Sequence, residues 1–442
     1  MKYHIHTLGC QMNVADSMRL ASGLEKLGCI KTDDVDQADI AVLNTCVVRQ
    51  SAEDRAYGWL NKMGELKRNK KPELTIGLMG CLVGVKGNKK VSNKYKFVDV
   101  MLPPSDPTSL LDLVEQQLSA RNYFRNKMTL QHDLQDGEIV LPQGDQNRNV
   151  ISYVPVVYGC SHACTFCIIP FRRGVERSRP VRDIVKECKS LTQQGVKEIV
   201  LLGQIVDRYG YDLEGDVKLS TLLKEVHKIP DVERVRFLTS HPNYMDDELL
   251  STVAELPKLC EHIEIPIQSG SDKILADMRR GYTVEQYYEL IERVRSYMPS
   301  ASISCDVIVG FPGETEADFV KTCEVLTDLK FDKVHIAKYS PRPGTVSSRR
   351  MIDDVPVKEK ERRRRILDEI QAGVVSSINR DYLGQTTEVL IESKHKDKWR
   401  GRTRTNKLVF VETGEDMTGK TVRVKVEWTG PWFMLGTAID NI

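Results

Sequence analysis

The chain reads Cys160-Ser161-His162-Ala163-Cys164-Thr165-Phe166-Cys167 directly after an expected strand that ends at Tyr158-Gly159. This loop carries three cysteines at the spacing CxxxCxxC. A structural zinc ion or a closed cubane cluster normally takes four protein ligands, whereas this loop offers three thiolates. One iron of a [4Fe–4S] cluster held here would stay open for a reactant. His162 is the alternative fourth ligand, although its place inside the turn favours a plain loop role.

Short apolar runs alternate with helix-like stretches on both sides of this loop, from residue 150 to about 345. The expected strands are 152–158, 197–203, 233–238, 262–267, 303–309 and 333–339. Six strand–helix units predict a partial parallel (β/α)6 barrel, in which the loops after the strands share one rim. The cysteine loop follows the first strand, so that rim is the expected site of the chemistry.

A second α/β pattern precedes the barrel. Its expected strands are 2–9, 38–45, 74–80 and about 97–102, and helix-like stretches cover 16–28, 50–68 and about 107–120. The pattern predicts an open, Rossmann-like α/β domain. Three of its strands run into Cys10, Cys46 and Cys81, which can converge because ligands bind at the carboxyl ends of strands in such sheets.

The alternative for these three cysteines is a role as small apolar core residues, since free cysteine packs well in cores. Their shared position at strand ends favours a ligand role. The remaining cysteines lack such a grouping and are expected to be structural: Cys29, Cys188, Cys260, Cys305 and Cys323.

Bulk composition sets limits but does not choose a partner. The chain has 442 residues, with 64 basic and 62 acidic side chains, so its net charge of +2 identifies no class of ligand. No signal-like N-terminus and no apolar run of membrane-spanning length is found, so we expect a cytoplasmic protein without a membrane partner. In a reducing compartment, 11 cysteines indicate metal ligation or catalysis and not a disulfide framework.

A charged helix is expected at 356–381, and its charges are expected to form ion pairs on a solvated face. After it the pattern changes from alternating strands and helices to strands without long helices. Strands are expected at 386–393, 399–405, 407–412, 421–427 and 432–439, which predicts a small β-barrel. Arg400, Arg402 and Arg404 alternate on one expected strand, so their positive charges would lie on one side of it, where they would suit the phosphates of a nucleic acid. The alternative is a solvated strand edge protected by charge.

The central loop resembles the radical S-adenosylmethionine (radical SAM) signature, in which SAM chelates the open iron and is cleaved reductively to a 5′-deoxyadenosyl radical. The resemblance implies that Phe166 lies near the SAM adenine, although a packing role is equally open. Gln204 stands where the superfamily often has an acid near the SAM amino group. Gln268 and Ser269 would bind the SAM ribose or carboxylate, or form an ordinary turn. The backbone at Val309 and Gly310 would cradle adenine.

Nearly the whole chain resembles the radical SAM methylthiotransferase family. The motifs that carry the resemblance are 7–13 (TLGCQMN), 44–46 (NTC), 80–81 (GC), the central cysteine loop, 173–179 (RGVERSR), 278–283 (MRRGYT) and 339–345 (YSPRPGT). The polar stretch 121–149 is expected to be a linker, which divides the chain into parts at 1–120, 150–380 and 381–442. The resemblance implies that these parts are a methylthiotransferase domain with an auxiliary [4Fe–4S] cluster on Cys10, Cys46 and Cys81, a radical SAM domain and an RNA-binding TRAM β-barrel.

The family's branches modify either an adenosine beside the tRNA anticodon or an aspartate of a ribosomal protein. Cys10-Gln11-Met12-Asn13 resembles the branch that converts N6-dimethylallyl-adenosine to its 2-methylthio form. That branch usually has Asn-Val-Asn where this chain has Ile205-Val206-Asp207, so contacts near the substrate are expected to differ.

The resemblance implies two [4Fe–4S] clusters, SAM as both radical source and methyl donor, a reducing electron donor, and the anticodon stem-loop of tRNA as partner, with no DNA. Three alternatives remain open. They are methylthiolation of threonylcarbamoyl-adenosine in tRNA, methylthiolation of the ribosomal aspartate, and a non-catalytic, metal-stabilised RNA-binding protein.

Overall fold

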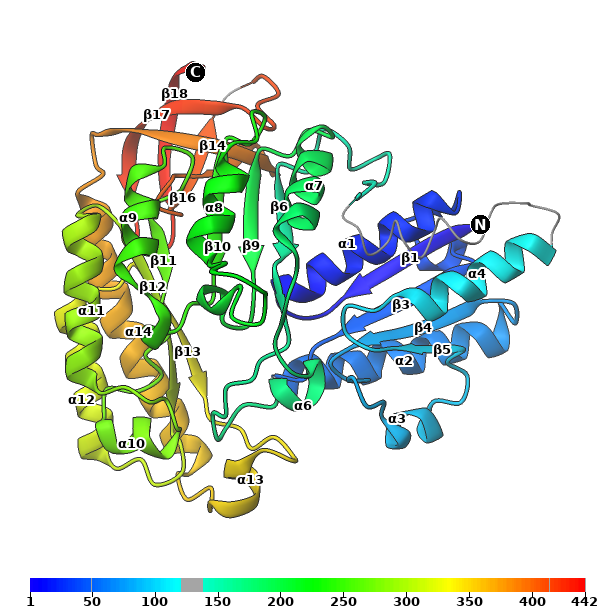
Figure 1. The fold of residues 1–442 in the computed structure, drawn as a ribbon, viewed down its shortest axis with the longest axis horizontal. Coiled ribbons are helices and arrows are strands. Elements are labelled where there is room, and N and C mark those ends of the chain that lie inside the picture. The colour runs from blue at the N-terminus through cyan, green and yellow to red at the C-terminus, as the bar shows by residue number, and fades with distance from the viewer. Residues whose placement is uncertain (49, 121–137, 413, 442) are drawn as a thin grey trace. The chain divides into compact units, whose positions relative to one another are not determined.

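The computed structural model describes residues 1–48, 50–120, 138–412 and 414–441 (Figure 1). Most of the expected linker, 121–137, therefore lies outside the described residues. The chain forms two compact units. The N-terminal unit comprises residues 1–146, 152–162 and 168–194, and the C-terminal unit comprises residues 147–151, 163–167 and 195–442. None of the helices described is both long and apolar enough to cross a lipid bilayer.

A five-stranded parallel sheet forms the centre of the N-terminal unit, in the order β2-β1-β3-β4-β5. Its strands are β1 (Lys2–Thr7), β2 (Ile30–Lys31), β3 (Ile40–Thr45), β4 (Thr75–Gly80) and β5 (Val100–Leu102). Every residue of β3 and β4 is buried, as expected for parallel strands covered on both faces. The predicted open α/β domain is confirmed.

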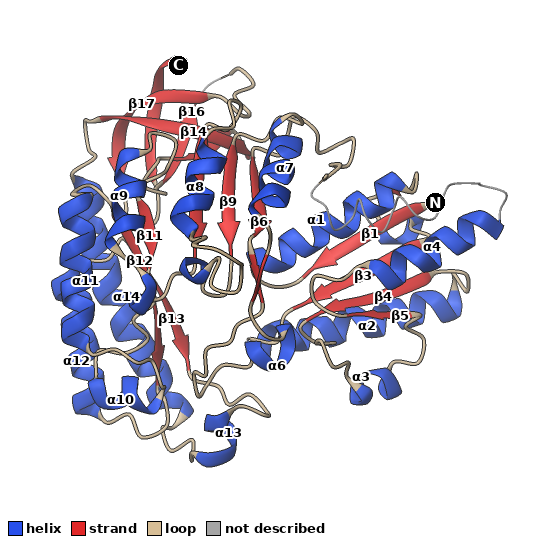
Figure 2. Ribbon diagram, viewed as in Figure 1, coloured by secondary structure: helices blue, strands red, loops and turns tan. Residues whose placement is uncertain are grey.

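Helices cover both faces of this sheet (Figure 2). They are α1 (Gln11–Lys26), α2 (Gln50–Asn69), α3 (Lys89–Lys94) and α4 (Thr108–Ala120), with a short 3₁₀ turn η1 (Val35–Gln37). Leu24 of α1 and Leu110 of α4 share one core with Val42, whereas Leu60 of α2 shares the opposite core with Leu43. Successive β3 residues thus point to opposite faces, which is the period of two that a strand imposes.

The rest of the N-terminal unit flanks the cysteine loop in the sequence. It contains most of β6 (Ile151–Pro155), with β7 (Val157–Tyr158), α6 (Ile169–Arg173), β8 (Arg177–Ser178) and α7 (Val181–Thr192). β7 and β8 pair antiparallel. The strand expected at 152–158 is therefore present but broken into two pieces.

Strands and helices alternate in the C-terminal unit as predicted. Its parallel strands are β9 (Glu198–Leu202), β10 (Arg234–Leu238), β11 (His262–Glu264), β12 (Ser302–Val309) and β13 (Lys333–Lys338). β9 pairs with β10, and β12 pairs with both β11 and β13. A single bridge between Val235 and Leu259 joins β10 to the segment before β11. The pairings within each sheet and this bridge are all parallel, so the carboxyl ends of these strands lie on the same side.

Helices and turns connect these strands. They are η2 (Val206–Arg208), α8 (Leu219–His227), η3 (Pro242–Tyr244), α9 (Asp247–Glu255), α10 (Asp272–Asp277), α11 (Val284–Tyr297), α12 (Glu316–Leu329), α13 (Val346–Arg350) and α14 (Val357–Arg380). The expected ion pairs on α14 are present, for example between Arg364 and Glu361 at 2.7 Å.

A closed β-barrel ends the chain, in the order β14-β15-β16-β18-β17. Its strands are β14 (Thr386–His395), β15 (Lys398–Arg402), β16 (Leu408–Glu412), β17 (Thr421–Thr429) and β18 (Met434–Asn441). Closure leaves no free sheet edge, and inward side chains such as Val389, Val409 and Val424 fill the interior. Arg236 fixes the barrel to β10 by donating to the carbonyl oxygen of Thr403 at 2.8 Å. The predicted small barrel is confirmed.

Candidate iron–sulfur and substrate site

Cys10, Cys46 and Cys81 follow three neighbouring strands of the N-terminal sheet. The strand registers pair Thr7 with Asn44 and Thr45 with Gly80, so the three strand ends are level. The backbones approach closely here, because a Cβ atom on the Gly9 position would stand only 2.9 Å from the Cys46 Cβ. The expected convergence of the three cysteines thus has a basis in the sheet.

Buried asparagines hold these strand ends together. The Cys10 thiol lies 3.4 Å from Asn13 Oδ1, and Asn13 Nδ2 donates to Asn44 Oδ1 at 2.9 Å and to the Thr45 carbonyl oxygen at 3.0 Å. The Cys81 N–H donates to the same Thr45 oxygen at 2.9 Å. Hydrogen bonds therefore link all three cysteine-bearing segments, and they would fix the ligands' orientation as the surroundings of a metal site do.

A buried cation faces the same cysteines. Burial raises the pKa of the Cys81 thiol to about 11, and Arg173 opposes that rise while Cys46 and Cys10 add to it. The three thiols are therefore near enough to interact electrostatically. Arg173 is 7% exposed, and its Nη2 lies 3.1 Å from Asp16 Oδ2. A guanidinium held in this position would compensate the negative charge of bound thiolates.

This donor set fits an iron–sulfur cluster. Within the part of the chain that the structure describes, no three His, Cys, Asp or Glu side chains surround the position of a single metal ion. The cysteines of a cluster each bind their own iron, so their sulfur atoms do not have to meet at one point. Three thiols at level strand ends beside a buried guanidinium are compatible with that geometry.

The central cysteine loop is fixed by its flanking backbone. In the N-terminal unit, the Cys160 N–H donates to the Gly174 carbonyl oxygen at 3.1 Å. Gly159 has φ +68°, and a Cβ there would lie 2.0 Å from the Val175 carbonyl oxygen, so only glycine fits. In the C-terminal unit, the Cys167 N–H donates to the Cys164 carbonyl oxygen at 3.2 Å.

Arg280 connects Cys164 to the segment after β11. Its Nη1 donates to the Cys164 sulfur at 3.3 Å, its Nε donates to the Tyr282 hydroxyl at 3.1 Å, and it is 5% exposed. The Tyr282 hydroxyl in turn donates to the Ile267 carbonyl oxygen at 2.7 Å. Neither side chain was predicted as a site residue. The signal was present in the motif 278–283, but the sequence gives no reason to connect it with Cys164.

Several residues expected to bind SAM come together in the C-terminal unit. Gln268 has φ +75° and pairs with Val307, which brings the 266–271 segment beside the end of β12. Ser269 and Val309 are fully buried there. The Gly310 N–H donates to Glu314 Oε2 at 2.5 Å. The backbone of these two segments lies close enough together to bind one ligand between them. That this ligand is SAM remains a prediction.

Phe166 and Gln204 occupy different surroundings. Phe166 packs against a buried cluster that includes Met278 and Phe311, which agrees with the packing role left open for it. Gln204 is half-buried just beyond β9. Its position at a strand end is as predicted, and its ligand is untested.

Two carboxyl groups at strand ends of the C-terminal unit were not predicted as site residues: Asp207, which is buried, and Glu264, which is half-buried. Burial raises the pKa of Asp207 to about 8, although both of its oxygens accept from the His241 N–H, at 2.9 and 3.1 Å. Desolvation, with Asp306 as a neighbouring negative charge, raises the pKa of Glu264 above its ordinary value. The sequence pointed to Asp207, because Ile205-Val206-Asp207 differs from the Asn-Val-Asn usual in the branch that the chain resembles. Nothing in the sequence points to Glu264.

The three arginines expected to bind RNA do not form one row. Arg400 and Arg402 lie on β15 and share Glu392, with Arg402 Nε 3.0 Å from its carboxylate. Arg404 lies beyond the end of β15, and its Nη2 is 2.7 Å from Glu261 Oε1. The prediction of a single alternating strand is therefore wrong for Arg404, because the chain turns after Arg402. RNA binding by these arginines remains a prediction.

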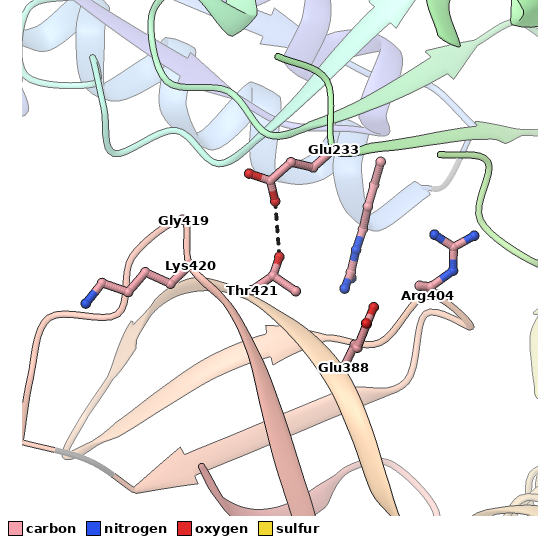
Figure 3. Close-up of a pocket in the computed structure, with 7 residues that line it drawn as sticks. Glu233, Glu388, Arg404, Gly419, Lys420 and Thr421 are labelled. Atoms are coloured by element: carbon pink, nitrogen blue, oxygen red, sulfur yellow. Dashed lines mark hydrogen bonds between the residues drawn. The ribbon is translucent and has the colours of Figure 1, made fainter. Parts of the chain in front are cut away.

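A pocket lies where the barrel meets the start of β10, and Arg404 lines it (Figure 3). Thr421 Oγ1 donates to Glu233 across it at 3.1 Å. Figure 3 shows the Glu388 carboxylate pointing into the same space from the barrel. The charged residues that line this pocket belong to the contact between the barrel and the start of β10.

Comparisons with known proteins agree with this arrangement. Residues 2–103 match the uncharacterized protein family UPF0004, residues 154–326 match the radical SAM superfamily and residues 380–439 match the TRAM domain. Among solved structures, the radical S-adenosylmethionine methyltransferase TsrM from Kitasatospora setae has a TM-score of 0.57 at 12% identity, covering 78% of this chain and 77% of that one. This likeness concerns the fold alone, and it supports the predicted radical SAM architecture.

Curated relatives that align over nearly the whole chain have a much higher sequence identity than these solved structures. The tRNA-2-methylthio-N(6)-dimethylallyladenosine synthase of Roseiflexus sp. (strain RS-1) is 43% identical over 98% of this chain and 89% of its own length. The enzyme of the same name from Herpetosiphon aurantiacus is 43% identical over 100% of this chain and 98% of its own. The chain therefore belongs to the radical SAM methylthiotransferase family, among the relatives that carry this name.

Proposed function

We propose that this protein is a tRNA methylthiotransferase that converts N6-(dimethylallyl)adenosine beside the anticodon to its 2-methylthio derivative. The observation that carries the proposal is the pair of cysteine triplets: one in the CxxxCxxC loop, and one at three level strand ends beside Arg173. The names of full-length relatives at 43% identity support the choice of substrate.

The chemistry of the carbon that would be modified, C2 of adenine, requires both cysteine sites. C2 of adenine carries an unactivated C–H bond that ordinary acid–base chemistry does not open. When bound, SAM and a cluster on Cys160, Cys164 and Cys167 supply a radical, and a cluster on Cys10, Cys46 and Cys81 supplies the methylthio sulfur, with its methyl from a second SAM. A cytoplasmic electron donor would complete the system.

The chain's own side chains would support both sites. Arg280 directs a buried guanidinium at Cys164 from 3.3 Å, so it would stabilise negative charge on that sulfur. Arg173 and the Asn13–Asn44 pair would do the same for the N-terminal cysteines, and the asparagines would also fix their positions. The β-barrel would add affinity for the tRNA, in keeping with its TRAM match.

Nucleoside mass spectrometry of tRNA from a strain that lacks the gene tests the proposal. We expect the 2-methylthio nucleoside to disappear and its N6-dimethylallyl precursor to accumulate, with restoration by the intact gene. Loss of a methylthio threonylcarbamoyl-adenosine instead would assign the chain to that branch. An unchanged tRNA profile together with an unmodified ribosomal aspartate would assign it to the protein-modifying branch, and either result would overturn the proposal.

A further inference from the structure

A cation lies between two tyrosine rings at the rim of the C-terminal unit. The guanidinium carbon of Arg208 is 4.4 Å from the centroid of the Tyr211 ring and 4.8 Å from that of the Tyr244 ring. The two ring centroids are 6.0 Å apart, with an interplanar angle of 67°. Arg208 ends the turn after β9 and Tyr244 ends the turn after β10. We call Arg208, Tyr211 and Tyr244 the rim platform.

The outermost ring of the platform is exposed but held in place. Tyr211 is 68% exposed, and its N–H donates to the Arg208 carbonyl oxygen at 3.2 Å. The neighbouring Gly210 has φ +91°, and a Cβ there would stand 1.9 Å from the Val217 carbonyl oxygen. The loop therefore presents a large aromatic face to solvent in a fixed position, which lowers the entropy cost of stacking a ligand on it.

Contacts lead from the platform to a cysteine of the central loop. The Tyr244 ring lies 5.4 Å from the His241 ring, which lies 5.6 Å from the Tyr282 ring. Tyr282 accepts a hydrogen bond from Arg280, and Arg280 donates to the Cys164 sulfur. The platform is thus the solvent-facing end of a continuous series of rings and guanidinium groups that reaches the expected radical-generating site.

The chemistry of the platform suits a nucleobase. Proteins recognise unpaired bases by stacking them on aromatic rings and on arginine planes, with little dependence on base identity. The chain after Tyr211 carries Asp212, Glu214 and Asp216, whose charges oppose a phosphate backbone at this place. The Arg208 guanidinium lies against the two rings, and the acidic residues that follow Tyr211 oppose phosphate, so the platform favours base stacking over phosphate contact.

We propose that the rim platform stacks an unpaired base of the anticodon loop next to the target adenosine. The inference rests on the proposed function, because a reaction at C2 requires the target base to leave the loop's stack, which leaves its neighbours in need of new partners. Tyr211 would supply the exposed face, and Arg208 with Tyr244 would support it. The platform contributes to binding and orientation of RNA, without contact to the reacting atoms.

Binding of an anticodon stem-loop RNA that contains N6-dimethylallyl-adenosine tests this role. The loop carries 2-aminopurine beside the target, whose fluorescence falls on stacking. We expect Tyr211→Ala in the full-length, cluster-loaded protein to weaken binding by about 5- to 150-fold, the range that loss of one stacked base produces. The fluorescence decrease should be lost, and the salt dependence of binding should stay that of the wild type.

Two variants serve as controls. Tyr211→Phe keeps the ring and should bind within about twofold of the wild type. Tyr297→Ala removes a tyrosine that is 38% exposed on α11, and it should leave RNA binding unchanged. Cleavage of SAM by Tyr211→Ala without RNA should equal that of the wild type, which shows that the variant is folded.

Several results would overturn the platform's role. Wild-type affinity of Tyr211→Ala, or a reduced salt dependence that reveals a phosphate contact, would exclude base stacking at Tyr211. If the wild type binds the RNA and methylthiolates it while Tyr211→Ala behaves identically, only the platform assignment fails. If the wild type neither binds nor modifies the RNA, the proposed function fails with it.

Discussion

At the scale of single residues, Arg280 is a buried positive charge directed at a cysteine sulfur. Hydrogen bonds and charges near ligand sulfurs set the reduction potentials of iron–sulfur clusters. Because reduction adds negative charge, loss of this guanidinium should destabilise the reduced state. We predict that Arg280→Gln lowers the midpoint potential of the cluster at the central loop by roughly tens of millivolts.

A redox titration followed by electron paramagnetic resonance measures this potential. The neighbouring Arg279 is exposed, so Arg279→Gln removes the same charge without touching Cys164 and serves as the matched control. Equal potentials in the two variants would show that the contact between Arg280 and Cys164 has no electrostatic role.

Asp207 gives the folded protein a pH-dependent stability. Its pKa rises from an ordinary value near 3.8 to about 8, chiefly through burial. Between these values the folded state holds a proton that the unfolded state has released, so this stabilisation is complete below pH 3.8 and is lost as the pH rises through about 8. The slope for one such proton is at most about 1.4 kcal/mol per pH unit.

Asp207→Asn should remove this dependence, and it also restores the residue usual in the branch that the chain resembles. We predict that the thermal unfolding midpoint of the wild type falls relative to that of the variant between pH 5 and pH 8, by up to about 1.5 °C per pH unit, and that the difference is constant above pH 8. Parallel curves for the two proteins would contradict a protonated Asp207.

At the scale of elements, a buried carboxylate on α7 holds two arginines of the N-terminal unit. Glu187 is fully buried and pairs with Arg19 of α1 and with Arg179, whose Nη2 is 2.6 Å from Glu187 Oε2. Loss of one partner from a buried ion pair leaves charge without compensation. We predict that Glu187→Gln destabilises the protein by about 3–5 kcal/mol.

Urea unfolding of the cluster-loaded protein measures this loss. Asp183→Asn on the same helix is the matched control, because its partner Arg182 is 89% exposed, and its cost should stay within about 1 kcal/mol. Equal midpoints for the two variants would show that the Glu187 pairs contribute no more than a surface ion pair.

Most elements could be predicted because apolar runs mark buried parallel strands. The expected strand at 38–45 is β3, and the expected strand at 303–309 is β12. Helix α1 begins at Gln11, earlier than the expected 16, because Cys10 and Asn13 cap it and their polar side chains hide the start of the helical pattern. The two-residue strands β2 and β8 are too short to give any periodicity.

The candidate site could be predicted from the sequence only in part. Cysteines at strand ends follow from local pattern and topology, but the groups that surround them come from distant parts of the chain. Arg280 is 116 residues from Cys164, and Arg173 is 157 residues from Asp16. Packing of the folded chain makes these contacts, and no spacing rule encodes them.

At the scale of the whole molecule, the two cysteine triplets are proposed to have different roles. The central loop would generate the radical, and the N-terminal triplet would deliver the methylthio group. Two [4Fe–4S] clusters contain about eight irons per chain, so removal of either triplet should leave about four. Cys323→Ala alters a cysteine outside both triplets and should keep the iron content and the activity of the wild type.

The measurement that tests this division most directly compares SAM cleavage with product formation in one reaction. With N6-dimethylallyl-adenosine tRNA, the triple variant C10A/C46A/C81A should still release 5′-deoxyadenosine but form no 2-methylthio nucleoside by mass spectrometry. The variant C160A/C164A/C167A should do neither. Formation of the 2-methylthio nucleoside by C10A/C46A/C81A would contradict the assignment of Cys10, Cys46 and Cys81 as the sulfur-delivering site.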